Sequence, residues 1–349
     1  MPWSLTGADG PKRSLEGLLR SGRIPHAVLL TGPEGGGKFT FAKDLAMAVN
    51  CEAPGAPAPP CGTCLSCRKI SEGNHPDLNV AKPRGKKGIH RIEDVRKFCE
   101  GLSLRPFEGR YKVLLVCGAD RFTDESGGAF LKTLEEPTPN TFIVMTAPAP
   151  SAVMATLVSR CLLFRIPPLS RKQILLELSL RKGLTGPDAE LAAGLSGGAL
   201  GRALAMDAAA ARTFRERMEE VFSRPKGPRR LVRALMLSGV MAADYDALKA
   251  EKPEKGSGDD ENRAAADWLE LAERSLMLWW RDAAVLGASG DEGLLDGPPP
   301  SGALRSFARE LDPSDLPAFE DAVARLTDSL RRFIRSELAF DSFWSSVIA

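Results

Sequence analysis

A glycine-rich turn that ends in a lysine is the first segment of this sequence whose residues could bind a phosphate group. The turn contains Gly32, Gly35 and Gly37 and ends at Lys38. It follows the apolar run 27–31 and opens a helical pattern, which is the context expected of a phosphate loop (P-loop). Backbone N–H groups in such a loop surround a phosphate, and the lysine reaches the terminal phosphates. The alternative, a chance glycine-rich turn, explains neither flank.

Two positions that should bind magnesium carry other residues. Phe39 stands where the motif has a Ser or Thr ligand, and Thr40 lies about 100° further around a helix. The apolar run 113–116 ends in Cys117-Gly118, whereas an active site would have an Asp-Glu pair to hold the metal and polarise water. We therefore predict neither a magnesium site nor intrinsic hydrolysis. Binding of ATP or ADP at a degenerate loop stays open.

Four cysteines are spaced as metal ligands. Cys51, Cys61, Cys64 and Cys67 follow the pattern C-x9-C-x2-C-x2-C, with the Pro- and Gly-rich segment 53–60 as a loop that lets the first cysteine fold back. Four thiolates suit one tetrahedral zinc ion at about 2.3 Å from each sulfur. Because such a site has no open position, the Zn²⁺ would be structural. Four free thiols are the alternative interpretation.

The composition restricts the class of protein. The chain has 349 residues, with 47 Lys and Arg against 45 Asp and Glu, so no broad basic field would hold nucleic acid. Its length suits two or three domains. The start of the chain has no secretory pattern, and the longest weakly polar run, 234–243, is far shorter than the roughly 20 residues of a membrane span. We expect no membrane association and a cytoplasmic location.

The positioning elements follow from the apolar pattern. Buried strands of a mainly parallel sheet are predicted at 27–30, 113–116, 142–145 and 162–164, with helices at 38–49, 92–102 and 124–134. Pro167-Pro168 ends this α/β pattern, and only helical patterns follow. Loose breaks are expected at 252–260 and 287–302. An apolar stripe is formed by residues spaced three and four apart, which predicts a core-facing helix: Leu269, Ala272, Leu276, Trp279 and Ala283.

Several motifs occur together in one order. After the P-loop and the cysteines come His75-Pro76-Asp77, then Lys132-Thr133-Leu134-Glu135-Glu136-Pro137, then Ser159-Arg160-Cys161. In this order and spacing the chain resembles the bacterial DNA polymerase III clamp-loader AAA+ family, closely over 26–164 and more weakly beyond. Loss of both magnesium positions makes it look like the delta prime type of that family and unlike the gamma and tau motors.

The resemblance implies roles for particular residues. Arg160, assisted by Ser159, would act in trans as an arginine finger on a neighbouring motor subunit. Without the resemblance, an arginine that caps a strand or pairs on the surface would be the preferred interpretation. Thr146 stands at the family's sensor 1 position, and Arg202 resembles sensor 2. Because the magnesium ligands are missing, the alternative is that both residues have a purely structural role.

The resemblance also implies an organisation and partners. We expect an AAA+ P-loop domain over 1–168 with the zinc module inserted at 51–67, a small helical lid over 169–207 and an all-α collar over 208–349. Partners would be the gamma or tau and delta subunits, and, through the assembled complex, the sliding clamp and primer-template DNA. The basic residues Lys82, Arg84, Lys86, Lys87 and Arg91 would either touch a DNA backbone or line a solvated loop.

Two other functions remain to be distinguished. One is an active gamma or tau type motor in which Thr40 and Asp120 have taken over metal binding. The other is a zinc-bearing P-loop regulator unrelated to replication. Magnesium-dependent hydrolysis by the isolated chain would identify the first. Copurification with sliding clamp and polymerase subunits would argue against the second.

Overall fold

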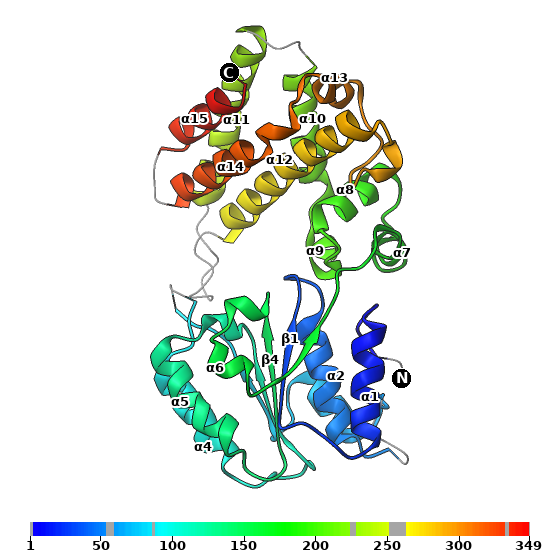
Figure 1. Ribbon diagram of the computed structural model, residues 1–349, viewed down its shortest axis with the longest axis vertical. Helices are drawn as coiled ribbons and strands as arrows, with labels where there is room; N and C mark the ends of the chain where they lie inside the picture. The colour runs from blue at the N-terminus through cyan, green and yellow to red at the C-terminus, as the bar shows by residue number, and fades with distance from the viewer. Residues whose placement is uncertain are drawn as a thin grey trace. The chain divides into compact units, whose positions relative to one another are not determined.

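The computed structural model describes residues 3–53, 59–85, 88–223, 228–250, 263–331 and 335–348. They divide into two compact units (Figure 1). The first comprises Met1–Leu169 with Ala199–Arg202, and the second comprises Ser170–Gly198 with Ala203–Ala349. The predicted break at 252–260, the centre of the predicted loop at 53–60, and Lys86 and Lys87 lie outside the described residues.

The first unit is built on a five-stranded parallel sheet with the order β2-β3-β4-β1-β5. The strands are β1 (Ala27–Thr31), β2 (Leu78–Ala81), β3 (Lys112–Val116), β4 (Thr141–Ala147) and β5 (Leu162–Arg165). The three central strands are buried along their whole length. Burial on both faces explains their continuous apolar runs.

The one strand that the sequence did not reveal is β2. It is short, lies at the edge of the sheet and is only half-buried over its first three residues. Asn79 interrupts its apolar run. Because a strand at a sheet edge is covered less completely, its sequence need not be uniformly apolar. Without β2, the neighbour of β3 and the position of Lys82 after it could not be placed.

Helices cover both faces of this sheet (Figure 1). They are α1 (Asp9–Arg20), α2 (Lys38–Asn50), α3 (Leu65–Glu72), α4 (Ile92–Leu102), α5 (Asp124–Glu135) and α6 (Ala155–Val158). Residues of α1 and α2 pack in one apolar cluster with alternate residues of β1, and residues of α4 and α5 pack in the other. The three helices predicted here are confirmed, each to within about one residue.

In the described residues, the second unit contains helices and no strand. Its helices are α7 (Arg171–Lys182), α8 (Gly186–Ser196), α10 (Ala208–Phe222), α11 (Pro228–Ala250), α12 (Arg263–Ser289), α13 (Gly302–Glu310), α14 (Leu316–Arg331) and α15 (Ser336–Ile348), while α9 (Leu200–Ala205) begins in the first unit. Ser170 caps α7 by accepting a hydrogen bond from the backbone N–H of Gln173. The predicted apolar stripe of α12 is buried throughout, so it is a core face.

Aromatic side chains fill the core of this helical unit. Trp280 stacks on Phe319 with ring centroids 4.0 Å apart, and Phe222 lies 4.3 Å from Phe307. Such pairs stabilise a core beyond the burial of their area alone. The predicted division of the helical part into a lid ending at 207 and a collar stays a prediction. No helix in the described ranges combines the length and apolar character needed to cross a membrane.

Candidate functional site

The P-loop joins the end of β1 to the start of α2. Gly35 has φ 73° and Gly37 has φ 86°, both in the left-handed region that favours glycine. A Cβ on Gly32 would lie 2.3 Å from the carbonyl oxygen of Ile166, so no larger residue fits there. Each of the three predicted glycines is therefore required by the path of the backbone.

Lys38 folds back over this loop. Its Nζ donates hydrogen bonds to the carbonyl oxygens of Gly32, at 2.8 Å, and Pro33, at 2.7 Å. Desolvation lowers the pKa of Lys38, and the nearby charges of Glu34 and Asp120 oppose that shift. The ammonium group thus lies where a phosphate accepted by the loop would replace the two carbonyls as its partner.

The donor set beside the loop does not fit magnesium. Phe39 is 37% exposed and offers no ligand atom, and the tip of β3 presents Cys117 and Gly118. The hydroxyl of Thr146 already has hydrogen-bond partners at the tip of β3. It accepts a hydrogen bond from Gly118 N at 3.2 Å and lies 3.4 Å from Val116 O. Asp120 lies beyond the strand end and forms an ion pair with Arg121 at 3.1 Å.

Arg202, the residue that resembles sensor 2, lies beside the P-loop. The backbone N–H of Gly201 donates to Gly35 O at 2.8 Å, and a Cβ on Gly35 would lie 2.9 Å from Arg202 N. The positive charge of Arg202 is close enough to contribute to lowering the pKa of Lys38. The start of α9 therefore packs directly on the loop backbone.

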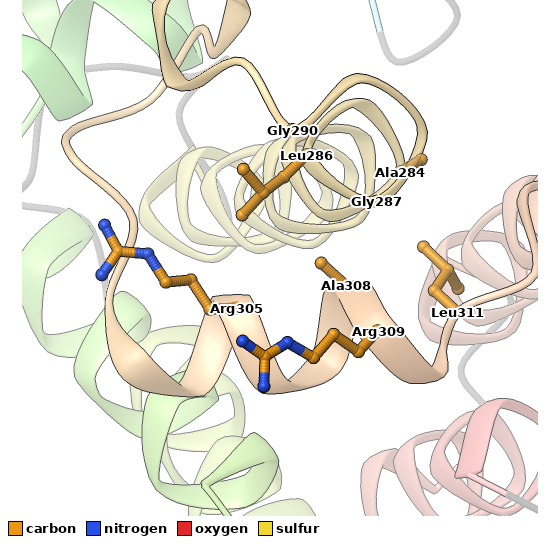
Figure 2. Close-up of a pocket in the computed structure, with 8 residues that line it drawn as sticks. All are labelled: Ala284, Leu286, Gly287, Gly290, Arg305, Ala308, Arg309 and Leu311. Carbon is orange, nitrogen blue, oxygen red and sulfur yellow. The ribbon is translucent and has the colours of Figure 1, made fainter.

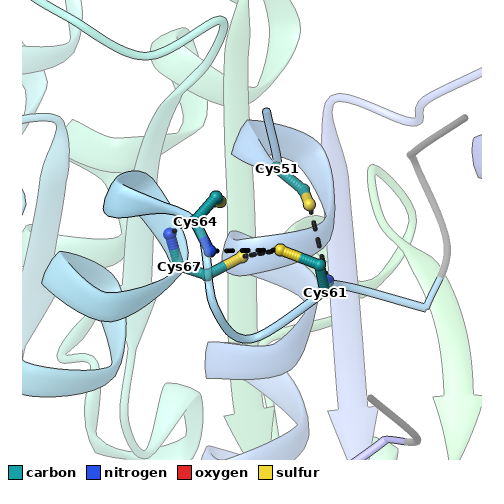
Figure 3. Close-up of side chains that lie close together, drawn as sticks. All are labelled: Cys51, Cys61, Cys64 and Cys67. Carbon is teal, nitrogen blue, oxygen red and sulfur yellow. Dashed lines mark hydrogen bonds between the residues drawn. The ribbon is translucent and has the colours of Figure 1, made fainter. Parts of the chain in front are cut away.

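The four spaced cysteines form one cluster (Figure 3). Cys51 follows the last residue of α2, Cys64 caps α3, and Cys67 lies in the first turn of that helix. All four sulfur atoms lie within 4.8 Å of one another, and those of Cys61 and Cys67 are 3.9 Å apart. Sulfurs around a tetrahedral zinc ion are separated by about 3.8 Å. The cluster could therefore hold a metal ion after small shifts.

Backbone N–H groups favour the thiolate form of one of these cysteines. Hydrogen bonds from Cys64 N and Thr63 N lower the pKa of Cys61 to about 6. Burial raises the pKa of Cys67, which has the opposite effect. One sulfur is thus a thiolate at neutral pH, while a buried neighbour would need a cation to ionise. This combination is suited to a metal site.

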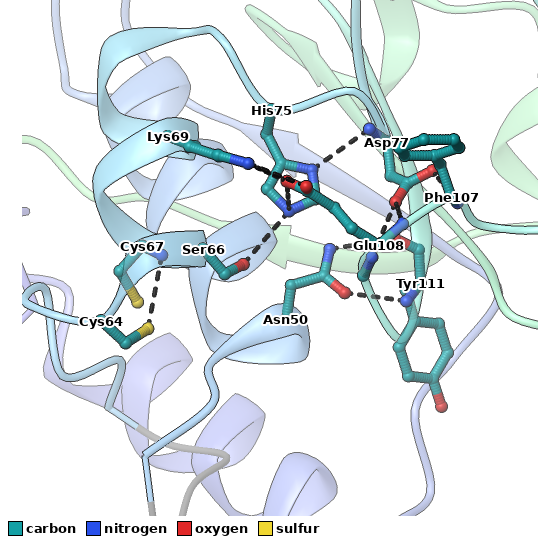
Figure 4. A network of polar contacts seen from close by, with 11 residues as sticks. Asn50, Cys64, Ser66, Cys67, Lys69, His75, Asp77, Phe107, Glu108 and Tyr111 are labelled. Atoms are coloured by element: carbon teal, nitrogen blue, oxygen red, sulfur yellow. Dashed lines mark hydrogen bonds and ion pairs between the residues drawn. The ribbon is translucent and has the colours of Figure 1, made fainter.

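A buried polar network joins the cysteine module to the sheet (Figure 4). His75 Nε2 lies 3.2 Å from Ser66 Oγ on α3 and 3.6 Å from Glu108 Oε1, while its Nδ1 accepts from Asp77 N at 3.1 Å. The carboxylate of Asp77 accepts three backbone hydrogen bonds, from Phe107, Glu108 and Gly109. Desolvation opposes them, but together they lower the pKa of Asp77. The His-Pro-Asp motif thus anchors the loop that leads into β3.

Arg160 lies in the turn between α6 and β5. Its Nη1 donates to Thr156 O at 2.9 Å and to Ser159 Oγ at 3.2 Å, and its Nη2 forms an ion pair with Glu135 at the end of α5. The side chain is 34% exposed. Burial raises the pKa of Cys161 to about 12, so this thiol is not a nucleophile at neutral pH. The hydroxyl of Ser159 is therefore one of three groups that hold the guanidinium.

A separate cavity of about 410 Å³ lies between α12 and α13 (Figure 2). Arg305 and Arg309 border it, and Arg305 is paired with Glu292 at 2.5 Å. None of the motif residues lines this cavity. The candidate chemistry thus lies in the first unit.

Comparison with known proteins agrees with these motifs. Residues 9–170 match the family model described as DNA polymerase III, delta subunit. DNA polymerase III subunit tau of Escherichia coli (strain K12) is 35% identical over 170 residues, 49% of this chain and 26% of that protein. Subunit delta' of Haemophilus influenzae is 37% identical over 136 residues, 39% of this chain and 41% of that protein. Residues 9–170 are therefore similar to clamp-loader subunits of DNA polymerase III.

The clamp-loader match is confined to part of the chain, which spans less than half the length of these relatives. Subunit delta' of Bacillus subtilis (strain 168) is 34% identical over 152 residues, 44% of this chain and 45% of that protein. Tau and delta' therefore match at similar identity. A gamma subunit-related protein of Thermotoga maritima covers 95% of this chain and 97% of its own, at 15% identity and a TM-score of 0.38, which supports no conclusion.

The predicted fold class is confirmed. It is an AAA+ P-loop fold with a parallel sheet, followed by helices. The sequence singled out Glu135 and Lys82 but did not reveal their contacts: Glu135 pairs with Arg160, and the ammonium of Lys82 lies 6.0 Å from the centre of the Phe39 ring. Glu135 stands in a recognised motif, but nothing in the sequence marks its partner.

Proposed function

We propose that this chain is a delta prime type, non-motor subunit of the bacterial DNA polymerase III clamp loader. In this role it supports ATP-dependent loading of the sliding clamp onto primed DNA, and Arg160 completes the ATP site of a neighbouring motor subunit. The observation that carries the proposal is a contrast within one domain. Both magnesium positions have lost their ligands at Phe39 and Cys117, whereas Arg160 remains partly exposed and oriented.

The chemistry of arginine explains why this residue acts in trans. A guanidinium has a permanent charge and a planar fork of donors, which stabilise charge on a transferring phosphoryl group. It needs no metal and no proton transfer. A subunit without its own hydrolytic centre can therefore still supply this group to another.

The remaining predictions fit the same role. The four-cysteine cluster would hold a structural Zn²⁺, and the helical part would contain the lid and the collar that joins gamma or tau and delta subunits. Sliding clamp and primer-template DNA would be reached through the assembled complex. The predicted cytoplasmic location follows from this role in replication.

The test uses a clamp loader reconstituted with its motor subunits. We expect Arg160→Ala to slow hydrolysis at the neighbouring motor subunit's site by about 10³-fold, the scale of losing an arginine finger, and so to lower the DNA-stimulated ATPase of the loader. Arg165→Ala is the matched control, since this residue is exposed on the adjacent β5. Both variants should assemble equally well by size-exclusion chromatography. Unchanged turnover in an assembled Arg160→Ala complex would refute the trans role.

The tau relatives support one second candidate, an active motor subunit. That function requires magnesium-dependent hydrolysis by the isolated chain, abolished by Lys38→Ala. For the non-motor subunit we expect no turnover above the background of the Lys38→Ala variant.

A further inference from the structure

Lys82 is the first residue after β2, and the sheet places it beside the end of β3. The two strands are parallel with Ala81 opposite Val116, and Cys117 N donates a hydrogen bond to Ala81 O at 2.9 Å. Lys82 and Cys117 are therefore neighbours at the carboxyl edge of the sheet. This is the edge at which the P-loop also lies.

The side chain of Lys82 extends toward α2. Its Nζ lies 6.0 Å from the centre of the Phe39 ring, within reach of a cation–π contact. Phe39 occupies one position that would normally provide a magnesium ligand, and Cys117 occupies the other. The ammonium group of Lys82 therefore lies near Phe39, and its charge also acts on Cys117.

We propose that Lys82 replaces magnesium as the counter-charge for a nucleoside polyphosphate, so that the P-loop binds ADP or ATP without a divalent cation. The inference rests on the P-loop domain of the proposed function, but not on Arg160. Lysine suits the task because its compact charge and flexible stem can follow a phosphate group. With Lys38 it supplies two ammonium groups to the polyphosphate, and the Phe39 ring restricts where the second one lies.

The same arrangement explains binding without turnover. An ammonium group neutralises phosphate charge, but it does not activate the attacking water as a metal with carboxylate ligands does. The β3 tip has no carboxylate, and Asp120 is paired with Arg121. Bound nucleotide would therefore remain intact and hold the loop against the start of α9.

The alternative is that Asp120 binds magnesium together with the nucleotide. Its carboxylate is only 16% exposed, and its charge is felt by Lys38. If Asp120 bound magnesium with the nucleotide, affinity would rise with the metal. If Lys82 supplies the charge, removing the metal should change little.

The experiment measures binding of fluorescent ADP and ATP analogues to the purified chain by anisotropy, in EDTA and in Mg²⁺. We expect the wild-type affinity to differ less than about threefold between the two conditions. Lys82→Ala should weaken binding in EDTA about tenfold or more, and Lys82→Arg should restore most of it. Lys97→Ala, an exposed lysine on α4, is the control and should bind as the wild type does.

Three results would overturn the inference: no nucleotide binding at all, binding that requires Mg²⁺, or equal affinity of Lys82→Ala and the wild type. Phe39→Ser provides an independent check, because a hydroxyl ligand should make binding respond to Mg²⁺. The loader ATPase of Arg160→Ala is measured separately. Failure of the nucleotide experiment therefore leaves the proposed trans function standing, and the reverse also holds.

Discussion

The P-loop edge, formed by Gly32–Lys38 and the tip of β3, and the Arg160 turn, Ser159–Cys161, have been altered to different degrees. The P-loop edge keeps its backbone path and its lysine but lacks both magnesium ligands. The Arg160 turn keeps a guanidinium held by two neighbours of its own turn and by Glu135. The first region thus lacks the side chains that would bind a metal, and the second presents a side chain with a permanent charge.

The two regions place different demands on the protein. A magnesium site needs several oxygen ligands at fixed distances, so one substitution disables it. An arginine finger needs only a turn that presents one side chain, since its charge does not depend on pH. The P-loop edge packs against the start of α9, and under the proposed function the Arg160 turn would supply a charge to a neighbouring subunit.

The largest effect should separate the two regions in one assay. In the reconstituted loader, Arg160→Ala should reduce hydrolysis at the neighbouring motor subunit's site about 10³-fold, whereas Lys38→Ala should change loader ATPase less than about threefold, because turnover takes place in other subunits. Steady-state phosphate release from equally assembled complexes provides the measurement. A large loss in Lys38→Ala would mean that this P-loop does take part in the cycle, and the contrast between the regions would be broken.

Removal of zinc should affect the P-loop edge and leave the Arg160 turn unchanged. Cys51 directly follows α2, whose first residue is Lys38, so loss of the metal frees one end of that helix. We expect Cys64→Ser to destabilise the first unit by about 4 kcal/mol, the scale of losing a structural metal. Thermal unfolding and bound zinc by atomic absorption measure this. Cys99→Ser, on α4 outside the cluster, should retain zinc and lose about 1 kcal/mol or less. Zinc-free wild-type protein would contradict the assignment.

Gly35→Ala tests whether the contact between the P-loop and the start of α9 stabilises the protein. Gly35 has φ 73°, and the added Cβ would lie 2.9 Å from Arg202 N. The strained backbone and the displaced contact should lower the free energy of unfolding by about 1–3 kcal/mol. Gly128→Ala is the control, since this residue is in α5 with open space around it, and there alanine should stabilise by up to about 1 kcal/mol. If the two variants changed the free energy of unfolding equally, as measured with denaturant, this stabilising contact would be excluded.

The sequence predicted those parts of both regions that are local in the chain. Central strands were visible as apolar runs because both their faces are buried, and the cysteine cluster was visible because three ligands fall within seven residues of one another. The pairing of Glu135 with Arg160 joins residues 25 positions apart, and its geometry depends on how α5 ends beside α6. The approach of Lys82 to Phe39 depends on β2, an edge strand without a clear apolar pattern.

The smallest expected effect concerns Glu135. Its ion pair with Arg160 is partly exposed on both sides, and such pairs contribute about 0–1 kcal/mol. Glu135→Gln keeps the shape and one acceptor oxygen but removes the charge that competes with phosphate for Arg160. Stability should change by about 0.5 kcal/mol or less, and loader ATPase should rise, by less than about fivefold and less at high salt. A fall of tenfold or more would show instead that the carboxylate must orient Arg160, and the Arg160 turn would then depend on a partner as strictly as a metal site does.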